Sequence, residues 1–141
     1  MRSGTDLTIA QLAHASGVKR ETVRFYEQRG LLPAPPRSAS GYRLYPPDAK
    51  KRVQFIKSAQ ALGFTLDEIA DLLTLRATPK STCSVVKSRA TKKIADIDRK
   101  ISALTAMKAA LVGIAVSCDG GTAPLSDCPI LSALESGEGA E

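Results

Sequence analysis

One long segment with a heptad pattern constrains this chain more than any other feature. Residues 81–116 contain no proline, and their only glycine is Gly113. A single helix with one narrow apolar stripe cannot bury that stripe alone, so the pattern predicts a partner helix. The positions that follow alternating steps of four and three are Ala90, Ile94, Ile97, Ile101, Leu104, Lys108, Leu111 and Ala115.

The partner helix can come from a second copy of the chain or from the chain's own N-terminal part. A self-dimer is favoured, because the N-terminal part has aromatic residues enough for a core of its own, and Lys108 would help to set the register of the two helices. No stretch approaches the 18 apolar residues of a membrane span, and residues 1–11 lack the apolar core of a signal peptide. The sequence therefore predicts a cytoplasmic protein without a membrane segment.

The first 30 residues read as two short helices. Thr8 can cap a first helix that begins at Ile9, and Gly17 supplies the left-handed residue that ends it. A second helix starts near Lys19 and stops at Gly30. Two short helices joined by a tight turn with glycine are typical of a helix-turn-helix, although any small helical hairpin fits the same residues.

The following stretch, residues 31–47, contains five prolines and cannot be helical. Residues 41–45 alternate and predict a strand in a short β-hairpin. Two more helices are expected, from about Ala49 to Gly63 and, capped by Thr65, from Leu66 to about residue 75.

The positive charge of the chain lies in this N-terminal part. Residues 1–81 hold 13 Lys and Arg against 7 Asp and Glu, whereas residues 82–141 hold 7 of each. A localised excess of cations binds polyanions through counterion release. A run of charge is more often a solvated face, but here it coincides with a fold suited to DNA. The residues suited to phosphates and base edges are Lys19, Arg20, Arg24, Tyr42, Arg43 and Tyr45.

Several motifs in chain order resemble the MerR family of transcriptional regulators. They are residues 7–13 (LTIAQLA), 17–18 (GV), 21–27 (ETVRFYE), 30–33 (GLLP), 41–45 (GYRLY) and 62–69 (LGFTLDEI). The resemblance implies a mainly α fold: a winged helix-turn-helix DNA-binding domain (1–80), an antiparallel dimerisation helix (81–117) and a metal-binding loop with a short helix and a flexible tail (118–141). It also implies a homodimer that binds double-stranded promoter DNA and acts on RNA polymerase there. The DNA-contacting residues that we expect are Lys19, Arg20, Thr22, Arg24, Tyr26, Arg37, Tyr42 and Arg43.

The three cysteines fit such a dimer. Cys83 begins the long helix and Cys118 follows its end, about 50 Å away along a helix that rises ~1.5 Å per residue. Within one chain they cannot share a ligand. In the antiparallel dimer that the resemblance implies, Cys83 of one subunit meets Cys118 and Cys128 of its partner. The alternative for each cysteine taken alone is a small buried apolar residue.

The loop from Cys118 to Cys128 resembles the metal-sensing branch of the family. Copper sensors of that branch use two cysteines in the loop and do not need the first, so Cys83 indicates a divalent ion. Zinc sensors add a cysteine and a histidine where this chain has Asp119 and Ala123, and zinc prefers four ligands. Mercury sensors use three cysteines. The expected inducer is Hg(II), with Pb(II), Cd(II) or Zn(II) as alternatives and no organic cofactor.

Two other functions compete with this interpretation. An enzyme with a cysteine nucleophile needs a base near the thiol, but the only histidine is His14, on the first helix. We therefore expect no enzymatic activity. A regulator of the same fold that senses oxidants would require an exposed, reactive thiol.

Overall fold

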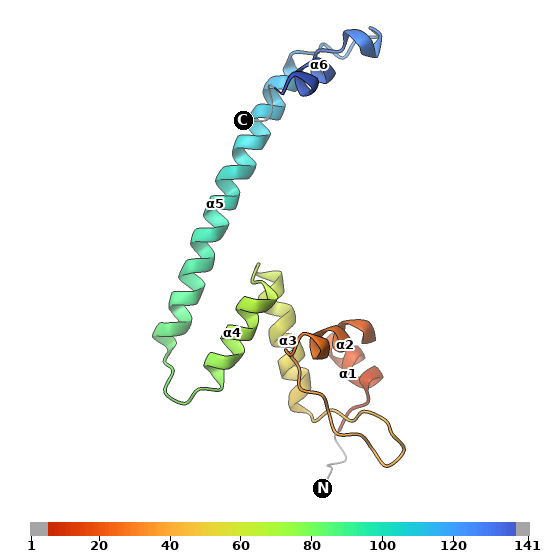
Figure 1. Ribbon diagram of the computed structural model, residues 1–141, viewed down its shortest axis with the longest axis vertical. Coiled ribbons are helices and arrows are strands. Elements are labelled where there is room, and N and C mark those ends of the chain that lie inside the picture. The colour runs from red at the N-terminus through yellow and green to blue at the C-terminus, as the bar shows by residue number, and fades with distance from the viewer. Residues whose placement is uncertain (1–5, 138–141) are drawn as a thin grey trace. The chain divides into compact units, whose positions relative to one another are not determined.

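The computed structural model describes residues 6–137, and the chain divides into two compact units between Lys93 and Ile94. The first unit holds the N-terminal helices and the start of the long helix, and the second holds the rest of that helix with the C-terminal helix (Figure 1). The elements are α1 (Ile9–Ser16), α2 (Arg20–Gln28), α3 (Asp48–Ala61), α4 (Leu66–Arg76), α5 (Cys83–Val116), a 3-10 turn (Leu125–Asp127) and α6 (Pro129–Ser136).

The predicted helix-turn-helix is formed by α1 and α2. Thr8 caps α1 in a capping box, in which its side chain accepts from the Gln11 N–H and the Gln11 side chain accepts from the Thr8 N–H. Gly17 ends α1 with φ of 68°, a left-handed conformation that glycine adopts without steric cost. Lys19 then serves as the N-cap of α2. The turn between the two helices is therefore fixed by local residues.

The core of the first unit lies where α1 packs on α2 and α3, and where α3 packs on α4. Val23 and Tyr26 are the α2 residues in this core, whereas Phe25 is 41% exposed. Arg52 ties the core to the loop after α2, because its Nε donates to the Leu31 carbonyl at 2.7 Å. The buried apolar residues are Leu12, Ala13, Val23, Tyr26, Leu31, Leu32, Tyr45, Ala49, Val53, Ile56, Ala59, Ile69 and Leu73.

The loop between α2 and α3 is less regular than the sequence predicts. Within residues 6–137 it forms no strand, only two isolated antiparallel bridges, Leu7 with Tyr45 and Arg37 with Arg43. The expected β-hairpin is thus reduced to a turn with one bridge. The physical reason is that proline lacks an N–H and cannot extend a ladder, and five of the residues between 31 and 47 are prolines. We call residues 36–45 the wing.

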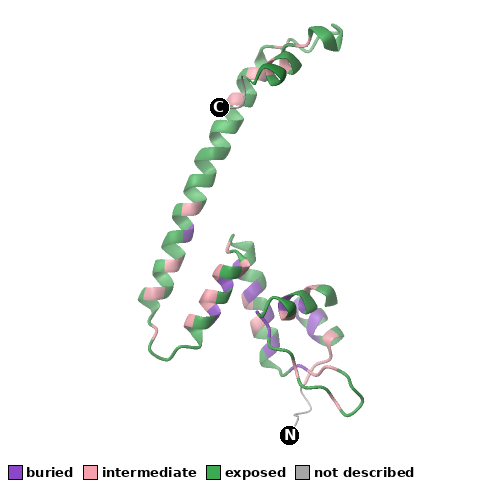
Figure 2. Ribbon diagram, in the orientation of Figure 1, coloured by how far each residue is buried: buried purple, intermediate pink, exposed green. Residues whose placement is uncertain are grey.

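The long helix α5 begins at Cys83, two residues after residue 81, from which the sequence predicts the dimerisation helix. Its heptad positions are exposed in the single chain: Ile94, Ile101, Leu104 and Leu111 are 55–60% exposed (Figure 2). The exposure is what a helix waiting for a partner would show, and the choice between a second chain and the N-terminal part stays a prediction. The predicted mainly helical fold, with a helix-turn-helix followed by a long helix, is confirmed.

The second unit also contains α6, which begins as predicted. Cys128 is its N-cap and Pro129 is its first residue, a position that proline favours because its missing N–H has no partner there anyway. Gly137 ends α6 in a left-handed conformation. The expected flexible tail falls largely on residues 138–141, which lie outside the described residues.

Candidate DNA interface and thiol site

A groove of about 400 Å³ lies between α2 and the wing. Arg24 reaches it from α2, and Arg37, Tyr42 and Arg43 reach it from the wing. Arg24 and Tyr42 are exposed, and the Tyr42 ring is 69% exposed although it is large and apolar. The structure thus brings four of the predicted DNA-contacting residues to one surface.

Glu27 of α2 contacts two residues of the wing beside this groove. Its Oε2 lies 3.3 Å from Arg43 Nη1, and its Oε1 accepts a hydrogen bond from the Tyr45 hydroxyl. Tyr45 is only 1% exposed, and burial, followed by the hydrogen bond to Glu27, raises its pKa to about 12. The sequence suggested Tyr45 for DNA contact, but the structure places it in the core. Its hydroxyl instead links α2 to the wing through Glu27.

The wing is held from within as well. Arg37 Nη1 donates to the Gly41 carbonyl at 2.9 Å, and the Tyr42 N–H donates to Ser38 Oγ at 3.1 Å. Gly41 has φ of 85°, which favours glycine at this turn. Tyr42 therefore stands on a turn whose backbone is fixed by its own polar contacts.

The start of α2 carries the remaining predicted contacts. Lys19 and Arg20 are exposed and Thr22 is half-buried. Lys19 is the N-cap of α2 but makes no side-chain capping hydrogen bond. In a helix-turn-helix the N-terminal residues of the second helix are those that meet base edges.

Tyr26 differs from its neighbours on α2. It is 2% exposed, its hydroxyl donates to Gln60 Oε1 at 2.7 Å, and burial raises its pKa. The structure therefore gives Tyr26 a packing role between α2 and α3. Arg24, two residues earlier, lies on the exposed face of the same helix.

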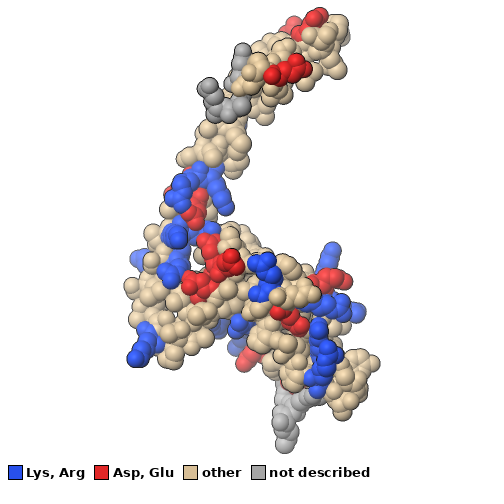
Figure 3. Space-filling model, in the orientation of Figure 1, with Lys and Arg blue, Asp and Glu red and all other residues tan. Residues whose placement is uncertain are grey.

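The charge distribution agrees with this assignment of surfaces. Lys and Arg side chains gather on the N-terminal unit and the first half of α5, and the part of the chain beyond carries scattered acidic residues (Figure 3). No Lys or Arg follows Lys108 in the sequence. The basic region is thus the region that contains the helix-turn-helix.

All three cysteines are free thiols. Cys83 is the first residue of α5 and is exposed, and Cys118 and Cys128 are half-buried in the second unit. Cys118 Sγ accepts from the Gly120 N–H at 3.4 Å, in a turn where Gly120 has φ of 74°. Within the described residues of one chain, no three His, Cys, Asp or Glu side chains lie close enough to hold a metal ion.

A helix-turn-helix with an adjacent basic groove, followed by a long helix with an exposed heptad stripe, defines a DNA-binding regulator built to dimerise. Residues 7–75 match the family described as "MerR HTH family regulatory protein", and residues 50–114 match the one described as "MerR, DNA binding". The chain belongs to the MerR family of transcription regulators, which are DNA-binding proteins and not enzymes.

Several regulators are similar to this chain over most of its length. A mercuric resistance operon regulatory protein of Serratia marcescens is 39% identical, over 92% of this chain and 88% of the relative. The HTH-type transcriptional regulator CueR of Salmonella typhimurium is 35% identical, over 91% of each chain. The transcription regulator PbrR691 from Ralstonia metallidurans CH34, solved in complex with lead(II), matches with a TM-score of 0.80 and 38% identity, covering 91% of this chain and 98% of that one.

Membrane insertion has no support in the helices that the structure describes. Over residues 6–137, none combines the length and the apolar character that a bilayer crossing requires.

Proposed function

We propose that this chain is a metal-responsive transcription regulator that binds promoter DNA as a homodimer and activates a heavy-metal resistance operon when Hg(II) binds. Pb(II), Cd(II) and Zn(II) are the alternative inducers. Similar proteins support this class of regulator, because one is named for mercuric resistance and another was solved in complex with lead(II). The choice of a soft metal rests on the three free thiols, because thiolate sulfur binds soft ions.

In this proposal the groove between α2 and the wing contacts the DNA backbone. Arg24, Arg37 and Arg43 supply charge for phosphates, and Tyr42 adds an exposed ring with a hydroxyl donor. Lys19, Arg20 and Thr22 at the start of α2 are placed for groove contacts.

The exposed heptad stripe of α5 forms the dimer. An apolar stripe that remains 55–60% exposed at Ile94, Ile101, Leu104 and Leu111 is stabilised when a second helix covers it. With the two α5 helices antiparallel, the start of one helix lies beside the end of the other. Cys83 of one protomer then lies beside Cys118 and Cys128 of its partner.

The observation that carries the metal proposal is the placement of the thiols. Cys83 is the first residue of α5, Cys118 lies two residues after its last, and Cys128 caps α6. No metal-binding group of three forms among the described residues of one chain, so a three-thiolate site requires two chains. Thiolate sulfur suits soft ions, whereas the chain's single histidine, His14, lies on α1.

The response to metal would come from a change in the DNA. Bound metal supplies a link among the three thiolates, and it shifts an equilibrium only if one conformation of the dimer binds it more tightly. The loop from Cys118 to Cys128 would close against the partner's Cys83 and reorient the two helix-turn-helix units. Promoter DNA would then bend and untwist so that RNA polymerase can use it, at a cost of about 1–6 kcal/mol.

A mixed dimer tests the shared site. A Cys83→Ser protomer paired with a Cys118→Ser/Cys128→Ser protomer keeps one complete site and destroys the other. Hg(II) titration, read by thiolate charge-transfer absorbance, should show tight binding at half the stoichiometry of the wild type. Loss of all tight binding would mean that each site lies within one chain.

A further inference from the structure

Two ion pairs fasten the first turns of α5 to α4. Lys93 Nζ lies 2.7 Å from Glu68 Oε1, and Arg89 Nε lies 2.6 Å from Asp71 Oδ2. The two cations are four residues apart on α5, and the two carboxylates are three apart on α4. Residues at these spacings share one face of a helix. We call Glu68, Asp71, Arg89 and Lys93 the α4–α5 clamp.

Lys93 is the buried member of the clamp. It is 5% exposed, whereas lysine is almost never fully buried unless it is paired. Its Nζ also lies 5.7 Å from the centre of the Phe64 ring, within the range of a cation–π interaction. The ion pair with Glu68 joins this buried ammonium group to α4, and removing the carboxylate from a buried ion pair is costly.

Glu68 links this contact to the start of α4. Its Oε1 accepts from the Thr65 N–H at 2.8 Å, and Thr65 Oγ1 accepts from the Glu68 N–H at 3.1 Å, which completes a capping box. The hydrogen bond to Lys93, and then the Thr65 N–H, lower the pKa of Glu68 to about 2. One carboxylate thus serves both the α4 terminus and the α5 junction.

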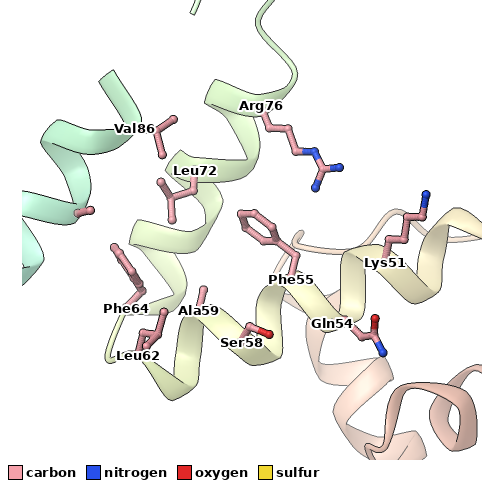
Figure 4. Close-up of a pocket in the computed structure, with 11 residues that line it drawn as sticks. Lys51, Gln54, Phe55, Ser58, Ala59, Leu62, Phe64, Leu72, Arg76 and Val86 are labelled. Carbon is pink, nitrogen blue, oxygen red and sulfur yellow. The ribbon is translucent and has the colours of Figure 1, made fainter. Parts of the chain in front are cut away.

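Apolar packing does not replace the clamp. An open groove of about 870 Å³ lies between α3, α4 and the first turns of α5, and its wall is mostly apolar (Figure 4). Val86 of α5 lies on one side of the groove with Leu72 of α4, and Phe55 of α3 lies further along it. Val86 is still 45% exposed. The junction is therefore held by polar contacts around a space that side chains do not fill.

The clamp also ends where the first compact unit ends. That unit runs through Lys93, and the first large apolar residue of the exposed heptad stripe is the next one, Ile94. The turns of α5 up to Lys93 therefore belong with the helix-turn-helix, and the rest belongs with the dimer seam and two of the three thiols. Along one chain, a displacement of the seam reaches the helix-turn-helix through the turns that the clamp holds.

We propose that Lys93 and Glu68 are positioning residues that couple metal binding to promoter distortion, an inference that rests on the proposed function. While the α4–α5 clamp is intact, the helix-turn-helix moves together with α5. When the clamp is weakened, α5 can move while the helix-turn-helix keeps its position on the DNA. The metal site and the DNA-binding surface are coupled only if the dimer has two conformations and each ligand contacts those conformations differently. Weakening the clamp should therefore leave both binding steps and remove the link between them.

The test uses the full-length protein, Hg(II) and an operator that the wild type selects from random duplexes, placed between the polymerase elements of a reporter promoter. Lys93→Met keeps an unbranched chain over Phe64 without charge. Glu68→Gln removes the charge but keeps the capping box, because glutamine also serves at that position. Lys93→Arg restores the charge. The matched control is Lys92→Met, which makes the same replacement at the neighbouring, exposed lysine of α5.

For Lys93→Met and Glu68→Gln we expect about a tenfold lower ratio of induced to basal transcription, within the usual range of allosteric coupling. Operator affinity and the stoichiometry of Hg(II) titration should match the wild type. Lys92→Met should be induced normally, and Lys93→Arg, which keeps the positive charge, should retain most of the induction.

Two results would overturn the inference. In one, the clamp variants are induced as well as the wild type. In the other, they lose operator binding without metal, which would make the clamp purely structural. A wild type that binds its operator but responds to none of Hg(II), Pb(II), Cd(II) and Zn(II) would refute the proposed metal response itself, and the coupling role would fall with it.

Discussion

The replacement Ile101→Ala tests whether the heptad stripe of α5 is a dimer seam. It removes three carbon atoms, which are worth about 2.4 kcal/mol when fully buried, at ~0.8 kcal/mol each. Ile101 is 55% exposed in the single chain, so a second helix can bury about half of that, roughly 1.3 kcal/mol per protomer. A two-fold symmetric dimer contains the substitution twice. The dimer should lose about 2.6 kcal/mol, and its Kd should rise roughly 80-fold.

Sedimentation equilibrium over a range of protein concentrations measures this Kd directly. Val116→Ala is the matched control, because Val116 lies on α5 outside the heptad positions and is 77% exposed. Its dimer Kd should stay at the wild-type value. The reasoning would be refuted if Ile101→Ala left the dimer Kd unchanged and instead lowered the free energy of unfolding of a monomer. That result would mean that the stripe packs within one chain.

Three further predictions address DNA contact, metal response and stability. Arg24→Ala should weaken binding to specific and non-specific duplexes alike and lower the salt slope of log K by about one unit; an unchanged slope in a filter-binding titration would remove Arg24 from the phosphate contacts. Cys128→Ser should keep promoter occupancy, measured by footprinting, while abolishing transcription induced by Hg(II), and release from the promoter would instead indicate simple derepression. The pKa of Glu68 is about 2 in the folded chain against 4.5 for the unperturbed group, so its contact with Lys93 should contribute stability above about pH 4.5 and lose it as the pH falls toward 2. Urea unfolding of the wild type and Glu68→Gln at pH 7 and pH 3 should therefore give a difference in the free energy of unfolding that shrinks at the lower pH, and a difference independent of pH would contradict the assignment.

Local features of the fold could be predicted because the residues that cause them are neighbours in the sequence. Thr8 and Thr65 each cap a helix, and Gly17 ends α1 with a positive φ where the sequence predicts it. The start of α6 at Pro129 follows the same logic. The wing was predicted less well, since a strand between prolines depends on which N–H groups can find partners across the loop, and only two bridges form.

The candidate site divides in the same way. The sequence identified the arginines, the exposed Tyr42 and the three thiols, because charge and chemical type belong to the residue itself. Whether Tyr26 or Phe25 enters the core depends on how α2 meets α3, and the structure buries Tyr26 against Gln60.

What the sequence by itself determined is the set of helices, their caps and the heptad stripe that demands a partner. Only the tertiary structure decided which polar side chains form ion pairs and hydrogen bonds with one another. Glu27 contacts Arg43 and Tyr45, 16 and 18 residues further along the chain. Lys93 reads as one of several surface lysines of α5, yet it is buried against Glu68, 25 residues earlier. Such contacts depend on how separate helices pack, and no spacing along one helix encodes that.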